Sequence, residues 1–382
     1  MTADRKNQGA HSRREFLRIA GASAVGAGVA PGLVAGSEEA GTITATVGIA
    51  KSQSVAEAVR DAVAMSGGLD FIKPGQKVLI KPNQAGPAKH PATTNPEVIY
   101  EVCKLVAEAG CKNIFLSDRG FILFKDGTSL MKTIGHYDAA KQAETDVGGG
   151  VKVTPVAFHE AGPYLTRGSP VWREIHHPLA RHYIDPDGKD VGFKLAELLF
   201  QVDHVINVPC AKVHNQCWFT MSMKAFVGMA DPTTTRTYFH TRAGKGIKGV
   251  PGKGGRFTGP FYGTEADATP ISRMIAELNL PLTPALNIID GTKPIYEGDH
   301  VTGDSVKADV IIASRDRIAA DVAGIALLKS LGNEERLHSI SPWQHPMVRH
   351  AQDIGLGVTH RNDLTVKHKG VDNIDTLLGY MA

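Results

Sequence analysis

The chain has 382 residues, enough for one large domain or two smaller ones with a substantial apolar core. Its formal net charge is +3, from 42 basic and 39 acidic side chains, which excludes the strongly basic surface typical of nucleic-acid-binding proteins. Its four cysteines are too few for the disulfide framework of a small secreted domain.

The first residues have the pattern of an export signal. Residues 12–18 read SRREFLR, a twin-arginine motif, and a weakly apolar, Gly/Ala-rich run follows at 19–34. That run is too short, and too poor in large aliphatic residues, to span a bilayer stably, which is typical of a cleaved signal. We therefore expect a signal peptide at 1–36, recognised by the twin-arginine translocase, and an exported, periplasmic α/β domain at 37–382.

Strand and helix patterns alternate after the signal. Residues 41–49 alternate as a strand does, and Ser54 is placed to cap the helix that follows. A second strand is predicted at 77–80, a helix from 96 to 109 and a third strand at 113–116. Strand, helix and strand at this spacing predict βαβ units with parallel strands and right-handed crossovers.

The pattern is weaker in the middle of the chain and returns toward its end. We expect a strand at 151–158, an irregular excursion at 159–189 and a short helix at 193–200. Residues 240–262 are rich in glycine and lysine and too polar to pack in a core, which predicts a long loop. Helices are also predicted at 269–278 and 318–331, and strands at 202–208, 285–289, 308–313 and 358–369.

Together these elements predict an α/β fold with a mostly parallel sheet flanked by helices. The excursion and the glycine/lysine-rich loop are expected at the carboxyl edge of the strands. Several predicted strands end in polar residues, and in a parallel sheet those ends lie along one edge, where α/β proteins bind their ligands. We therefore expect one crevice lined by Lys81, Asn83, Asp118, Arg119, Lys212, His214 and Asp290.

The densest set of reactive side chains follows the strand at 202–208, which Pro209 ends. Cys210, His214 and Cys217 have the spacing and chemistry to bind a transition metal, with His240 or an aspartate as a fourth ligand. Two alternatives stay open, which are a disulfide between the two cysteines in an oxidising compartment and two cysteines buried in the core.

Positive side chains in the same region suit an anionic ligand. The apolar run at 218–229 predicts a packed helix that carries Lys224. With Lys81, Lys212 and Arg119, this lysine would line an edge that binds a carboxylate or phosphate, whereas the alternative is four solvated surface charges. Lys212 and His214 could also act as an acid–base pair. Asp118 and Asp290 would then orient these bases, bind a hard cation, or serve as turn residues.

With these motifs in view, the chain resembles the DUF362 family of bacterial and archaeal proteins, which have no assigned activity. The resemblance implies an α/β domain, and some members carry an attached ferredoxin-like segment with iron–sulfur clusters. The family usually has a Lys-Asn pair where Lys224 and Ala225 stand, so any role of that asparagine amide is lost or moved. The matching segments are KVLIKPN (77–83), residues 93–118, DHVINVPCAKVH (203–214), the stretch around Lys224, and residues 290–321.

Three functions are compatible with these observations. The first is a pocket for a small anionic ligand, with acid–base chemistry by lysine and histidine. The second is a redox accessory protein that holds a transition metal or iron–sulfur cluster through Cys210, His214 and Cys217 and works with a redox partner. The third is a periplasmic binding module without catalysis. None of them involves nucleic acid.

Overall fold

A computed structural model describes residues 43–120, 126–183, 189–232, 234 and 268–382. The expected signal peptide, His240 and the glycine/lysine-rich loop at 240–262 lie outside these residues. Within the described ranges, no helix has the length and apolar character needed to cross a membrane.

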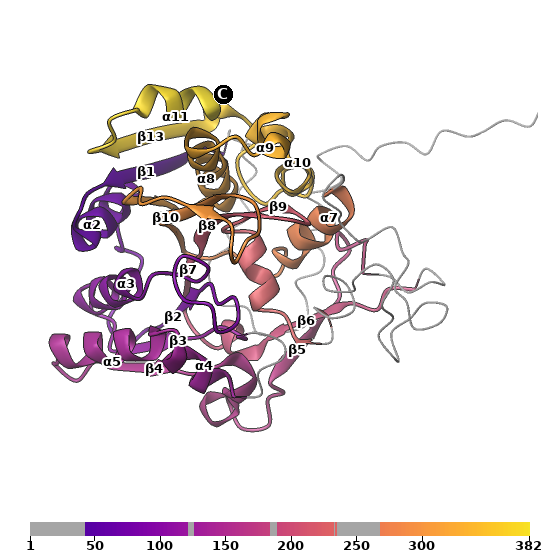
Figure 1. Ribbon diagram of the computed structural model, residues 1–382. Helices are drawn as coiled ribbons and strands as arrows, with labels where there is room; N and C mark the ends of the chain where they lie inside the picture. Colours follow the sequence, from indigo (N-terminus) through magenta and orange to yellow (C-terminus); the bar gives the residue numbers. More distant parts are fainter. Residues whose placement is uncertain (1–42, 121–125, 184–188, 233, 235–267) are drawn as a thin grey trace, which may run out of the picture. The chain divides into compact units, whose positions relative to one another are not determined.

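One large sheet runs through the described part of the chain (Figure 1). Neighbouring strands along its main path are parallel, except around one strand that runs against both its neighbours. The expected α/β fold with a mostly parallel sheet is therefore confirmed. In spatial order the strands are β13 (Leu364–Lys369), β1 (Ala45–Lys51), β12 (Val310–Ser314), β10 (Leu286–Glu297), β7 (His204–Val208), β2 (Lys77–Pro82), β3 (Asn113–Leu116) and β4 (Lys152–Pro155).

The reversed strand is β12, and its direction follows from the connection that leads into it. Parallel neighbours need a crossover of a dozen or more residues, usually a helix. Between β10 and β12 the chain instead forms the short strand β11 (Asp304–Ser305), which pairs back onto β10. Because no helix intervenes, the chain turns back and β12 runs antiparallel to β10.

Helices cover both faces of the sheet, and the alternation along each strand decides which face a side chain joins. In β2, Val78 and Ile80 belong to one apolar cluster and Leu79 to the other. Ser54 and Asn95 cap two helices with their side chains, as their sequence positions indicate. The first cluster includes α2 (Val55–Met65), α3 (Pro96–Glu108) and α5 (His136–Val147), and the second includes α7 (Thr269–Leu278), α8 (Arg317–Leu331) and α10 (Pro346–Asp353).

Two stretches in the middle differ from their expected structure. Residues 193–200, expected as a helix, form β6 (Phe193–Ala196) and then the 3-10 helix η3 (Glu197–Phe200). The excursion contains β5 (Trp172–Ile175), which pairs with β6 in a separate small sheet. Such short runs hold too few residues for their period to separate strand from helix. The remaining elements are α4 (Gly127–Thr133), α9 (Glu335–His338), α11 (Ile374–Tyr380), η1 (Phe158–Glu160), η2 (Gly162–Tyr164), η6 (Pro342–Gln344) and η7 (Arg361–Asp363).

The prediction of one packed helix at 218–229 is wrong. The chain after Pro209 forms β8 (Cys210–His214), a tight connection and β9 (Trp218–Thr220), which pairs antiparallel with β8. Trp218 has a φ of 65°, which a helix does not allow. Only the end of the run is helical, as the 3-10 helix η4 (Lys224–Gly228). An apolar run of this length fits a buried strand as well as a buried helix, so its composition alone could not decide.

Buried polar side chains hold the segment between β9 and η4 in place. The carboxylate of Asp321, on α8, accepts hydrogen bonds from the backbone N–H groups of Ser222 (2.6 Å) and Met223 (3.0 Å). Asn207, on β7, donates from its side-chain amide to the Ser222 carbonyl (2.9 Å), and Asn279 donates to the Met223 carbonyl (3.1 Å). The segment that leads to Lys224 is thereby tied to the sheet and to two helices.

We expect Asp321→Ala to lower the free energy of unfolding by about 2 to 4 kcal/mol, because it leaves two buried N–H groups without an acceptor. Asp353→Ala, which removes an exposed carboxylate at the end of α10, should change it by less than about 0.5 kcal/mol. Urea unfolding followed by circular dichroism measures both values. Equal values for the two variants would contradict this role of Asp321.

Candidate functional site

A cavity of about 110 Å³ lies where the carboxyl ends of β2 and β3 meet β8, β9 and η4. Three polar residues in its wall, Gln84, Thr220 and His300, are not among the predicted site residues. Gln84 directly follows Asn83 and was readable from the same strand edge, whereas Thr220 was assigned to a helix and His300 lies beyond the expected end of its strand. The predicted residues in the wall are Lys81, Asn83, Asp118, Arg119, Lys212, His214 and Lys224.

Strand alternation brings two of these side chains to the same wall. Along β8, Ala211 and Val213 pack into an apolar cluster. Lys212 and His214 alternate with them and both line the cavity. All four residues are at least nine-tenths buried. The positions of the lysine and histidine side chains are therefore fixed by the strand and its surroundings.

A buried ion pair forms one side of the cavity. Lys81 Nζ lies 2.7 Å from Asp118 Oδ2, and each side chain is only 1% exposed. The other carboxylate oxygen of Asp118 accepts a hydrogen bond from the Gly120 N–H (2.7 Å). Gly228, on η4, packs directly on the pair, since a Cβ there would lie 2.8 Å from Lys81 Nζ and 2.9 Å from Asp118 Oδ2. A side chain at position 228 would therefore displace one or both members of the pair.

The other cations have different partners. Lys212 Nζ donates to the Ala92 carbonyl (2.5 Å), and the Arg119 guanidinium donates to the Ala230 carbonyl (3.3 Å). The Ala92 carbonyl carries no full charge, so this contact does not neutralise the charge of Lys212. Lys224 is partly exposed and makes no hydrogen bond or ion pair with any residue in the described ranges. Its ammonium group can therefore bind a ligand without breaking an existing contact.

Burial and mutual repulsion affect the charges of these groups. Burial lowers the pKa of Lys212 and of Lys224, and the nearby cations lower it further. Burial likewise lowers the pKa of Arg119, to about 10, against the opposing effect of Asp118. The pKa of His300 falls to about 4, through burial and then through Lys224 and Lys212, so this imidazole is neutral at pH 7.

Two imidazoles stack beside the turn of the β8–β9 hairpin. The ring centroids of His214 and His300 lie 4.3 Å apart. The backbone N–H of Gln216 donates to His214 Nδ1 (3.1 Å), so the neutral ring of His214 carries its proton on Nε2. Gln84 Oε1 and Thr220 Oγ1 are buried and have no hydrogen-bond partner among the described residues, whereas His300 Nδ1 lies 3.4 Å from Asp299 Oδ2. Buried polar atoms without partners are rare, and two in one wall suit a polar ligand.

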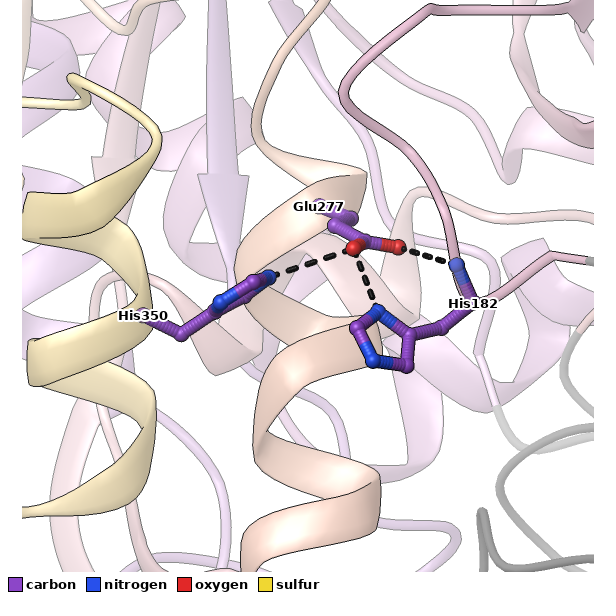
Figure 2. A group of neighbouring side chains, drawn as sticks. All are labelled: His182, Glu277 and His350. Carbon is purple, nitrogen blue, oxygen red and sulfur yellow. Dashed lines mark hydrogen bonds and ion pairs between the residues drawn. The ribbon is translucent and has the colours of Figure 1, made fainter. Parts of the chain in front are cut away.

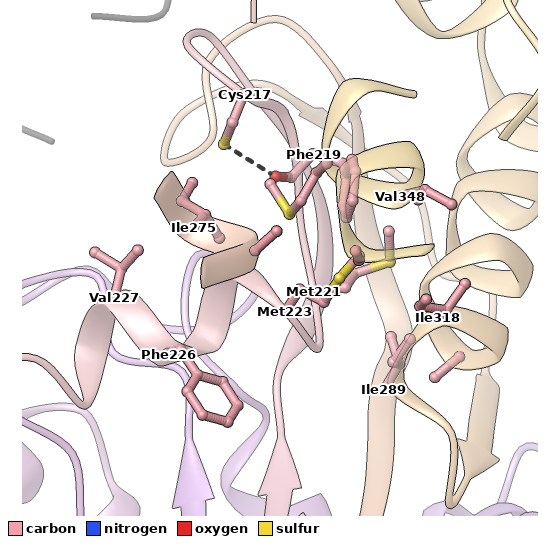
Figure 3. Packing of buried hydrophobic residues seen from close by; sticks show 14 of the residues in the cluster. Cys217, Phe219, Met221, Met223, Phe226, Val227, Ile275, Ile289, Ile318 and Val348 are labelled. Carbon is pink, nitrogen blue, oxygen red and sulfur yellow. Dashed lines mark hydrogen bonds between the residues drawn. The ribbon is translucent and has the colours of Figure 1, made fainter. Parts of the chain in front are cut away.

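Among the described residues, Cys210, His214 and Cys217 are not brought together as a group of metal ligands. Cys217 donates its thiol to the Phe219 carbonyl (3.2 Å) inside an apolar cluster (Figure 3). Cys210 accepts a hydrogen bond from the Asn83 amide (3.3 Å), and both cysteines are free thiols. Burial raises the pKa of Cys210, and that of Cys217 to about 11, which disfavours the thiolate that a metal needs. In the described ranges, no ligand group with atoms within 4.8 Å of one another includes Cys210, His214 and Cys217.

Asp290 is also not in the wall of the cavity, because its strand does not end there. The sequence analysis expected a strand end at this residue, but β10 continues to Glu297. The buried Asp290 carboxylate accepts hydrogen bonds from the backbone N–H groups of Asn95 (2.7 Å) and Thr292 (3.0 Å). These contacts hold the start of α3 against β10, so the role of Asp290 in this structure is to stabilise the fold.

We expect Asp118→Asn to lower the free energy of unfolding by about 3 to 5 kcal/mol, because it leaves the buried Lys81 ammonium without a counter-charge. Asp372→Asn is the matched control, since Asp372 pairs with Lys51 at the same distance of 2.7 Å but with side chains 78% and 40% exposed. The control should change the free energy by less than about 1 kcal/mol. Urea unfolding at pH 7 compares the two, and a loss below that of the control would contradict the assignment.

Three comparisons show which known proteins this chain is similar to. Residues 78–326 match the family described as "Domain of unknown function (DUF362)". A thylakoid-associated protein of Synechocystis sp. is 25% identical over 271 residues, which cover 70% of this chain and 68% of that protein. The lactate racemase apoprotein from Thermoanaerobacterium thermosaccharolyticum aligns with a TM-score of 0.38 and 13% identity, over 68% of this chain and about half (54%) of that one. The family match covers more than half of the sequence, and the chain therefore belongs to the DUF362 family.

Proposed function

We propose that the protein binds a small anionic ligand, a carboxylate or a phosphate, in the cavity beside η4. The observation that carries this proposal is the ammonium group of Lys224, which lines the cavity without a partner among the described residues. Four cationic side chains and one carboxylate, Asp118, line the same wall, and Asp118 is already paired with Lys81. A bound anion would offset this excess of positive charge.

The size and polarity of the cavity support a small ligand. Pockets for drug-sized molecules span roughly 300 to 1,000 Å³, whereas this cavity has about 110 Å³. Lys224 and Lys212 would supply the charge, and Thr220 would donate from its hydroxyl, which has no other partner among the described residues. Charge-assisted hydrogen bonds to an anion are about twice as strong as neutral ones.

The proposed chemistry is proton transfer to or from the bound anion. Burial lowers the pKa of Lys224, so the ammonium group that binds the anion gives up its proton more readily and can act as the acid. Lys224 has no competing contact in the described ranges. His214, in the same wall, would be the second group of this acid–base pair. Turnover of a bound anion would distinguish an enzyme from a protein that only binds the anion in this pocket.

We expect Lys224→Gln to weaken the binding of sulfate and acetate at least about tenfold, because a charged hydrogen bond contributes about 1.5 to 3 kcal/mol. Sulfate and acetate are the probes for a phosphate-like and a carboxylate ligand. Lys307→Gln, which changes a lysine side chain 72% exposed, should leave the dissociation constants within about twofold. Isothermal titration calorimetry measures them. Wild-type protein that binds neither probe, or a Lys224→Gln variant with wild-type affinity, would overturn the proposal.

Affinity for sulfate, whose charge is constant over this range, should fall as the pH rises. A lysine is charged below its pKa, and the pKa values of Lys212 and Lys224 lie below the ordinary 10.5. Binding should therefore be strongest near pH 6 and decline before pH 10.5 is reached. Lys224→Arg should move the decline to higher pH, because arginine keeps its charge. Affinity that is constant up to pH 10.5 in the wild type would contradict a role for lysines with lowered pKa values.

A further inference from the structure

Three side chains that the sequence analysis did not connect meet between α7 and α10 (Figure 2). Glu277 lies on α7, His350 on α10, and His182 in the segment that follows β5. Glu277 Oε1 lies 2.5 Å from His182 Nδ1 and 3.1 Å from His350 Nε2. All three atoms lie within 4.8 Å of one another, so two imidazole nitrogens and one carboxylate oxygen converge on one point.

The carboxylate is fixed so that one oxygen faces both rings. Glu277 Oε2 accepts a hydrogen bond from the backbone N–H of His182 (3.1 Å), which leaves Oε1 for the imidazoles. The two rings are almost perpendicular, at 85°, with centroids 5.4 Å apart. A second contact that orients a carboxylate in this way is a usual feature of metal sites.

Burial and charge favour a cation at this point. The Glu277 side chain is fully buried, whereas His182 and His350 are 22% and 17% exposed, which gives an ion a path from solvent.

From this geometry we propose that His182, Glu277 and His350 bind a divalent transition-metal ion such as Zn²⁺. Two imidazoles and one carboxylate are a known ligand set for Zn²⁺ and for ferrous iron, with further positions open to water or another ligand. A tetrahedral ion with bonds of about 2.0 to 2.1 Å brings its ligand atoms to about 3.3 Å from one another. Glu277 Oε1 lies closer than this to His182 Nδ1 (2.5 Å) and to His350 Nε2 (3.1 Å). Small rotations of the side chains would lengthen both distances to the value that a bound ion requires.

This site is separate from the lysine cavity, because none of its three residues lies in that wall. The other reading of the same contacts is an ion pair without metal, in which both imidazoles donate to Glu277. Metal binding distinguishes the two, since an ion pair has no reason to bind Zn²⁺ at one equivalent and lose it when the histidines are removed.

The test is metal titration of the full chain after treatment with EDTA and dialysis. Zn²⁺ affinity is measured by competition with a coloured chelator, and Co²⁺ binding by its visible absorption, which reports nitrogen and oxygen ligands. The wild type should bind one equivalent of Zn²⁺ at this site. The His182→Ala/His350→Ala variant should bind it at least about 100-fold more weakly. The matched control, His176→Ala/His338→Ala, removes two histidines outside the group and should bind like the wild type.

Thermal unfolding provides a second measurement that does not depend on identical folding of the variants. Zn²⁺ bound to the folded state should raise the melting temperature of the wild type and of the control, in proportion to the logarithm of its concentration. It should leave that of the His182→Ala/His350→Ala variant unchanged. Circular dichroism shows whether each variant is folded, and if the double variant is not, His350→Ala alone takes its place. A wild type that binds no Zn²⁺, or a variant that binds it equally well, would overturn the proposal.

Discussion

The ion pair between Lys81 and Asp118 is the contact on which the arrangement at the strand edge depends. Lys81, at the end of β2, and Asp118, just after β3, are both buried charged residues. Because their charges neutralise each other, the carboxyl ends of the two strands can pack side by side. Such a pair is costly to form and more costly to break, so each partner requires the other. Gly228 packs on the pair at close range, which joins η4, and with it Lys224, to the same two strands.

Rigidity at this edge comes from polar contacts that lie deeper in the molecule. Asp321 and Asn207 hold the segment before η4 to α8 and β7, so Lys224 is positioned by the core rather than by a loose loop. Because the backbone that carries Lys224 is already ordered, only its side chain loses conformational entropy when an anion binds. Burial lowers the pKa values of Lys212 and Lys224, and the same fixed geometry lowers them further because it keeps the cations near one another.

Much of this could be predicted from local signals. Ser54 and Asn95 mark helix starts through capping chemistry that acts within a few residues. Lys81 and Asp118 were placed at one edge because parallel strands share a direction. The hairpin at Trp218 could not be predicted, since a buried strand and a buried helix have the same composition. Asp290 was misplaced because its strand continues, and His182, Glu277 and His350 have no spacing pattern, because only the fold brings them together.

The position of β1 has a consequence for how the chain acquires its structure. β1 is the first described strand, yet its two neighbours, β12 and β13, begin only at residues 310 and 364. During synthesis from the amino terminus, this apolar strand has neither partner until most of the polypeptide has been made. Pairings between such distant segments also slow folding, because the intervening chain must first be closed into a loop. Completion of the sheet is thus a late event, and premature release of the chain would leave two strand edges open to association with other molecules.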